Sequence, residues 1–173
     1  GICIIEEAWT TSSAQWDDII GVNLTGVFNT LRAATPVLME QGSGGSMIVT
    51  ASVAGIRAQA NIAAYNAAKH GVLGVMKSFA IELAPRGIRV NAVAPGNVDT
   101  PMIDNPAMFQ RFRPDLTDPQ KADAEPGFAA MNPMPVPWVD PADISAAVLW
   151  LASSESRYVT GQAIAVDAGL LLK

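Results

Sequence analysis

The stretch Ser46-Met47-Ile48-Val49-Thr50-Ala51 is a short apolar run, and the residues around it decide the fold class. It ends at Ser52 and is followed, over residues 64–84, by apolar positions that recur at the spacing of one buried helix face. A second apolar run over residues 88–94 has no charge after Arg89, as expected of a strand with both faces covered. Strand, helix and strand in this order predict an α/β fold with a parallel sheet.

The flanking segments extend this alternation in both directions. Ser12 and Gln15 form a capping box that opens a helix running toward Gln41. Pro36 is expected to kink this helix, and Gly42 to cap its end. Further downstream we expect a helix that begins within residues 140–143 and a last strand at residues 163–166.

A proline-rich segment, residues 96–139, separates the second strand from the helix that follows. It is too long for an idle connection in a compact domain. Its methionines and aromatic residues, among them Phe109, Phe128 and Trp138, supply an adaptable apolar surface. We interpret the segment as a substrate lid within a single catalytic portion that covers residues 1–173. The alternative is a flexible surface insertion or a linker between domains.

Composition narrows the function classes. The chain has 173 residues, half of them hydrophobic, which suits one domain with a real core. A formal net charge of -5 and scattered basic residues argue against nucleic-acid binding. Cys3 is the single cysteine, so we expect no disulfide framework, no metal site and a reducing, cytoplasmic location. No apolar run has the length of a membrane span, so no membrane partner is expected.

Three polar residues suggest redox chemistry on a carbonyl or an alcohol. Tyr65 and Lys69 stand four residues apart on one helix face, so the ammonium is expected to lower the phenol's pKa from about 10. Ser52, at the end of the first strand, would hold a carbonyl oxygen while Tyr65 moves a proton. None of these side chains transfers hydride, so the chemistry requires a redox cofactor.

The usual phosphate cradle for such a cofactor is missing from the sequence. No Gly-x-Gly-x-x-Gly pattern links a strand to a helix. The glycine-rich residues 42–46 run from a helix into a strand, which suits a helix C-cap and a tight turn. The chain also begins at Gly1 without Met, and we interpret it as a chain entered midway.

Five motifs follow one another along the chain: Asn23-Leu24-Thr25-Gly26, Ser52-Val53-Ala54-Gly55, Tyr65-Asn66-Ala67-Ala68-Lys69, Arg89-Val90-Asn91-Ala92-Val93-Ala94-Pro95-Gly96 and Val159-Thr160-Gly161-Gln162. In order and spacing they resemble the short-chain dehydrogenase/reductase family, across essentially the whole chain. The resemblance implies a doubly wound, Rossmann-type parallel sheet with helices on both faces, from which the N-terminal cofactor-binding half is absent here.

A narrower set of matches comprises Gly1-Ile2-Cys3, residues 65–71 with His70, residues 112–116, residues 135–138 and residues 166–169. These segments resemble the carveol-dehydrogenase-like, mycofactocin-associated branch of the family. That branch oxidises secondary alcohols with a nicotinamide cofactor that does not exchange readily. The expected cofactor is NAD. NADP stays open as the alternative, because the segment that selects between the two cofactors is absent from this sequence.

The resemblance also implies roles for single residues. Asn23 would bend its helix and hold a water that links to Lys69. Ser52 would bind the carbonyl or carbinol oxygen, and Tyr65 would be the acid/base. Lys69 would lower the pKa of Tyr65 and contact the nicotinamide ribose, whereas His70 points about 100° away on the helix and is expected to be structural. The expected cofactor contacts are Gly1, Tyr65, Lys69, Pro95, Gly96, Val98 and Thr100, and the expected substrate contacts are Val53, Met102, Phe109 and Trp138.

Three functional interpretations stay open. In the first, the chain is part of an alcohol dehydrogenase that transfers hydride between a secondary alcohol or ketone and a nicotinamide cofactor, and the chain alone is inactive. In the second, it is a non-enzymatic, truncated family member that acts as an oligomerisation or regulatory partner. Family members form homodimers or homotetramers through helices matching residues 12–41 and 64–84. The third, an enoyl reductase, is disfavoured because its tyrosine and lysine usually stand further apart than Tyr65 and Lys69.

Overall fold

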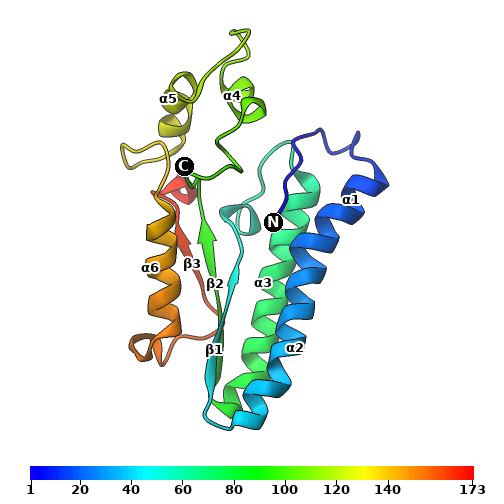
Figure 1. Ribbon diagram of the computed structural model, residues 1–173, viewed down its shortest axis with the longest axis vertical. Coiled ribbons are helices and arrows are strands. Elements are labelled where there is room, and N and C mark those ends of the chain that lie inside the picture. Colours follow the sequence, from blue (N-terminus) through cyan, green and yellow to red (C-terminus); the bar gives the residue numbers. More distant parts are fainter.

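Three parallel strands form the sheet at the centre of the chain. The computed structural model describes all residues from Gly1 to Lys173. Its strands lie in the order β1 (Gly45–Thr50), β2 (Ile88–Pro95) and β3 (Ala163–Val166). Because all pairings are parallel, the carboxyl ends of the strands meet at one edge of the sheet (Figure 1). The predicted α/β fold is confirmed.

The chain forms six α-helices besides this sheet: α1 (Ser13–Ile20), α2 (Gly26–Gln41), α3 (Ala63–Leu83), α4 (Pro106–Phe112), α5 (Lys121–Met131) and α6 (Pro141–Ala152). Short 3-10 turns lie at Val53–Gly55, Ala84–Arg86, Ser154–Ser156 and Leu170–Leu172. α2 and α3 pack on one face and α6 on the other, so both faces are covered (Figure 1). No helix has both the length and the hydrophobicity for a bilayer crossing. No three His, Cys, Asp or Glu side chains gather where a metal ion would fit.

A π-helical turn divides the helix predicted over residues 12–41. The turn spans Gly21–Thr25 and contains the buried Asn23, and π-helical turns of this kind are a common cause of helix bending. α2 instead continues through Pro36 without interruption. The break in the regular helix therefore lies at the turn that contains Asn23, whereas the kink at Pro36 stays a prediction.

The main core lies between α3 and the sheet. Val72 and Met76 of α3 are fully buried, and they pack in one cluster with Val90 of β2. The predicted apolar face of the helix is therefore the face that meets the strands. Phe79, also expected in that face, is only partly buried, and its ring meets that of Phe28 edge-on at 6.1 Å.

Residues 96–139 build a second, smaller core beyond the carboxyl edge of the sheet (Figure 1). Phe128 of α5 is 1% exposed, and its ring centroid lies 4.2 Å from that of Phe112 and 5.6 Å from that of Trp138. Phe109 of α4 is buried in the same cluster. The segment predicted as a lid thus contains two helices that the sequence did not predict.

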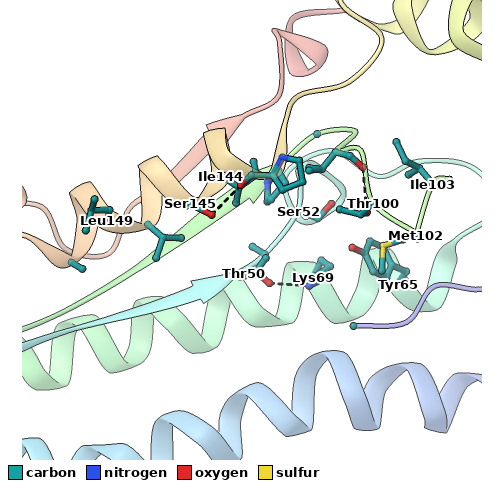
Figure 2. Close-up of a pocket in the computed structure, with 18 residues that line it drawn as sticks. Thr50, Ser52, Tyr65, Lys69, Thr100, Met102, Ile103, Ile144, Ser145 and Leu149 are labelled. Carbon is teal, nitrogen blue, oxygen red and sulfur yellow. Dashed lines mark hydrogen bonds between the residues drawn. The ribbon is translucent and has the colours of Figure 1, made fainter.

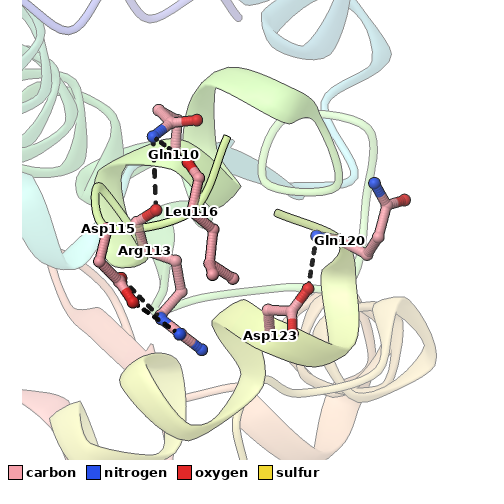
Figure 3. A network of polar contacts seen from close by, with 6 residues as sticks. All are labelled: Gln110, Arg113, Asp115, Leu116, Gln120 and Asp123. Carbon is pink, nitrogen blue, oxygen red and sulfur yellow. Dashed lines mark hydrogen bonds and ion pairs between the residues drawn. The ribbon is translucent and has the colours of Figure 1, made fainter. Parts of the chain in front are cut away.

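Polar contacts fix the connection between α4 and α5 (Figure 3). Arg113 forms a double contact with Asp115, in which Nη2 lies 2.8 Å from Oδ2 and Nε lies 2.9 Å from Oδ1. The backbone N–H of Gln120 donates to Oδ2 of Asp123 at 2.8 Å and closes the first turn of α5. Exposed ion pairs contribute little stability, so these contacts mainly define the path of the chain.

Candidate active site

The main cavity, of about 600 Å³, opens at the carboxyl edge of β1 and β2. Ligands of open α/β sheets bind at this edge. Ser52 follows β1, Tyr65 and Lys69 come from α3, and Thr100 lies in the loop after β2 (Figure 2). The predicted residues that the structure brings together here are Gly1, Ser52, Tyr65, Lys69, Pro95, Gly96, Val98, Thr100 and Met102.

A second cavity, of about 280 Å³, adjoins the first. The two share Ser52, Tyr65 and Met102 in their walls. Of these two cavities, the larger is lined by Lys69 and the smaller by Val53, a predicted substrate contact. Ser52 and Tyr65 therefore lie where two ligands, one in each cavity, would meet.

Ser52 is held in a turn that lies close against α3. Its Oγ accepts a hydrogen bond from the N–H of Ala54 at 3.1 Å. Gly55 permits the close approach, because a Cβ at this position would lie 2.6 Å from the backbone oxygen of Lys69. Backbone atoms on both sides thus fix the distance between the serine and the helix that carries Tyr65.

Replacing Gly55 by alanine is expected to push this turn away from α3. The added methyl group overlaps backbone atoms of Lys69, and such overpacking costs about 1–3 kcal/mol. Gly74→Ala is the matched control, because nothing lies within 4 Å of a Cβ at Gly74 in the same helix. That variant should gain about 0.5–1 kcal/mol. Urea unfolding measures both changes, and equal stability of the two variants would contradict the close approach.

Burial governs the titration of Tyr65 and Lys69. Nζ of Lys69 donates to the carbonyl oxygen of Thr50 at 2.9 Å (Figure 2), and burial lowers the pKa of this lysine from 10.5. Burial also raises the pKa of Tyr65 from 10.0, Ser52 as a hydrogen-bond partner lowers it, and Cys3 raises it further. Lys69 is not among the causes of this shift, so its lowering of the tyrosine's pKa stays a prediction. The Nζ of Lys69 lies over the ring of Tyr65, 5.5 Å from its centroid, and the largest cause of the tyrosine's raised pKa is the loss of hydration on burial.

Asn23 is buried and binds the first residues of the chain. Its Nδ2 donates to the carbonyl oxygens of Ile2 at 2.8 Å and Ile19 at 3.0 Å, and its Oδ1 accepts from the N–H of Ile2 at 3.2 Å. A cavity of about 470 Å³ has Asn23, Thr50 and Lys69 in its wall. The space between Asn23 and Lys69 is thus large enough for water, and the water link stays a prediction.

Two predicted substrate contacts, Phe109 and Trp138, line neither the main nor the second cavity. Phe109 is buried in the small core, and Trp138 packs on Phe128. Their aromatic rings therefore belong to the small core within residues 96–139, which corrects the expectation that they line the substrate space. Other residues were missed: Ile144, Ser145, Val148 and Leu149 of α6 line the main cavity (Figure 2), and Cys3 and Arg111 line the second. Helical spacing is a signal for the α6 set, whereas nothing local singles out Arg111.

The chain is similar to a family model and to several known enzymes. Residues 2–171 match the family model described as enoyl-(acyl carrier protein) reductase. The (-)-trans-carveol dehydrogenase of Rhodococcus erythropolis is 47% identical over 158 residues, which are 91% of this chain and 57% of that protein. Levodione reductase of Leifsonia aquatica is 39% identical over 158 residues, which are 91% of this chain and 56% of that protein.

A solved structure is similar over nearly the whole chain. The carveol dehydrogenase of Mycobacterium avium in complex with NAD superposes with a TM-score of 0.97 at 50% identity, over 98% of this chain and 61% of that one. The chain therefore spans somewhat more than half the length of these relatives. The match to residues 2–171 and the likeness to these enzymes show that the chain belongs to the short-chain dehydrogenase/reductase family.

Proposed function

We propose that the protein containing this chain transfers hydride between a secondary alcohol or ketone and a nicotinamide cofactor. The observation that carries the proposal is the convergence of Ser52, Tyr65 and Lys69 where two cavities meet. The similarity to a carveol dehydrogenase and a levodione reductase supports the same proposal. We propose NAD as the cofactor, on the similarity to an enzyme solved with NAD.

The residues of the main cavity fit the nicotinamide end of such a cofactor. Lys69 is 6% exposed, and the only hydrogen bond of its ammonium goes to the carbonyl oxygen of Thr50. An ammonium carries three N–H donors, so the donors left over suit the hydroxyl groups of a ribose. Pro95 and Val98 provide apolar wall for a planar ring. No helix of this chain starts at a glycine-rich turn that would bind a pyrophosphate.

The chemistry of the chain's own residues follows from this placement. Ser52 holds the carbonyl or carbinol oxygen by a hydrogen bond, and Tyr65 gives a proton to that oxygen or takes it away. A bound nicotinamide supplies or accepts the hydride. Burial raises the pKa of Tyr65 and so favours the protonated phenol over the phenolate. The protonated form is the proton donor for ketone reduction.

Further features belong to the same proposal. Residues 96–139 act as a substrate lid, and the protein belongs to the carveol-dehydrogenase-like, mycofactocin-associated branch, acts in the cytoplasm and is a homo-oligomer. Enoyl reduction is not proposed. The tyrosine and lysine of an enoyl reductase usually stand further apart than Tyr65 and Lys69, which are separated by one helix turn.

A second candidate is a non-enzymatic oligomerisation or regulatory partner. It is favoured by the exposed apolar side chains of the α1–α2 segment and α3, which include Trp16 (44% exposed), Val37 (55%) and Ile81 (76%). Such surfaces mark protein contacts. Binding of a nicotinamide cofactor separates this candidate from the enzyme.

The test uses the complete gene product that contains residues 1–173, called the full-length protein below. It should oxidise secondary alcohols with NAD, and reduced nicotinamide should form with the ketone in equal amounts. Residues 1–173 alone should bind no NAD in calorimetry, because they contain no phosphate cradle. Absence of both turnover and NAD binding in the full-length protein would reject the enzyme and leave the second candidate.

A further inference from the structure

The second cavity is an apolar chamber with a single charged residue in its wall. Ser52 and Tyr65 lie in the part that it shares with the main cavity, and Val53, Met102 and Met108 supply apolar surface. Arg111, from the last turn of α4, is the only charged residue that lines it. A ligand in this chamber thus meets the proton-transferring groups and a guanidinium within one small space.

The guanidinium of Arg111 has no anionic partner in the chain. The ion pairs of the structure use Arg113 and Lys121. Its one hydrogen bond, from Nη2 to the carbonyl oxygen of Ala60, is 3.5 Å long, beyond the usual range of 2.7–3.2 Å. Its charge nevertheless reaches the chamber, since it lowers the pKa of the Cys3 thiol against the larger opposing effect of burial.

Arg113, two residues further along the chain, shows the contrasting case. Asp115 holds its guanidinium through two contacts of 2.8 and 2.9 Å (Figure 3), and it lines neither cavity. The chain therefore supplies a carboxylate to the arginine that lines neither cavity. It supplies none to the arginine that lines the chamber.

The chamber has the size of a small molecule that could reach from Tyr65 to Arg111. Its volume of about 280 Å³ equals roughly nine water molecules at about 30 Å³ each. A compact molecule of about ten non-hydrogen atoms fills such a space. Most of the residues that line the chamber are hydrophobic, which suits a ligand with an apolar middle and polar groups at its ends.

We propose that the secondary alcohol taken by this site is a small aliphatic hydroxy acid, whose carboxylate binds Arg111 while its carbinol oxygen lies at Ser52 and Tyr65. The proposal rests on the proposed function and names its substrate class. A guanidinium binds a carboxylate through paired, charge-assisted hydrogen bonds. Arg111 is therefore a specificity-determining residue that acts on the far end of the substrate and takes no part in the proton transfer.

The test compares 5-hydroxyhexanoate with its uncharged amide, 5-hydroxyhexanamide, as substrates of the full-length protein with NAD. The two differ only at the end that would meet Arg111. We expect kcat/KM to be higher for the acid, and Arg111→Gln to lower the acid-to-amide ratio about 10- to 100-fold, as for loss of a charged hydrogen bond. Most of the change should appear in KM. Arg111→Lys should keep part of the preference, and Arg113→Gln, the matched control, should leave the ratio unchanged.

Other outcomes overturn the proposal or separate it from the proposed function. No preference for the acid in the unaltered protein, or an Arg111→Gln variant with an unchanged ratio, overturns it. If neither compound is turned over although other secondary alcohols are oxidised with NAD, the hydroxy-acid proposal is overturned and the proposed function stands. If no secondary alcohol is oxidised and NAD does not bind, the proposed function is rejected as well.

Discussion

Replacing Tyr65 by phenylalanine should lower the turnover number of the full-length protein at least about 100-fold, the smallest effect typical of lost acid/base catalysis. Phenylalanine keeps the ring, which packs against the small cluster that contains Ala64 and Ala68, so the fold should be retained. Only the oxygen that moves the proton is removed. Steady-state kinetics with a secondary alcohol and NAD measure the effect.

Tyr158→Phe is the matched control for this change. Tyr158 is the only other tyrosine and is 90% exposed, outside both cavities. Its replacement should leave kcat within about twofold of the unaltered value, far below the loss expected for a catalytic proton donor. Near-normal turnover of the Tyr65→Phe variant would reject Tyr65 as the acid/base.

Local signals predicted most of the regular elements. The capping box predicted at Ser12 is present, α6 begins after its N-cap Asp140 within the predicted range, and Gly42 ends α2 with a φ of 66°. Each signal depends on residues within three or four positions, so the sequence alone contains the information. The last strand, Ala163–Val166, begins and ends as predicted.

Tertiary contacts decided what the sequence could not show. α5 contains Pro126, which argues against a helix on local grounds, yet the segment is helical with Phe128 buried beside it. The spacing of Tyr65 and Lys69 correctly placed both side chains at one cavity. The direction in which the tyrosine's pKa shifts depends on how deeply the side chain is buried, and burial cannot be predicted from residue spacing.

The difference between local signals and tertiary contacts also explains which residues line the two cavities. Phe109 and Trp138 were expected there because aromatic residues in a long loop suit a binding surface. In the structure they fill the small core, which removes them from the cavities. Arg111 faces the second cavity because α4 is turned that way, and the helix itself depends on that core.

Phe128→Ala is therefore expected to loosen the lid segment and leave the sheet intact. Phe128 is 1% exposed and is the central ring of the small core, with Phe112 and Trp138 on either side. Truncation of a buried phenylalanine costs about 3–5 kcal/mol. The residues of the main core, such as Met76 and Val90, belong to a separate cluster, so the loss should be confined to residues 103–138.

Hydrogen exchange of the full-length protein, read peptide by peptide, tests where the stability is lost. Amides of α4 and α5 should exchange faster in the Phe128→Ala variant, by a factor set by the local loss of stability, while those of β2 and α3 keep their protection. Phe128→Leu, which retains most of the buried volume, should show a much smaller change. Uniform acceleration in β2 and α5 would mean that the two cores unfold together. In that case residues 96–139 are not an independently opening lid, because opening the substrate space would require melting the sheet on which Ser52 and the helix of Tyr65 are held.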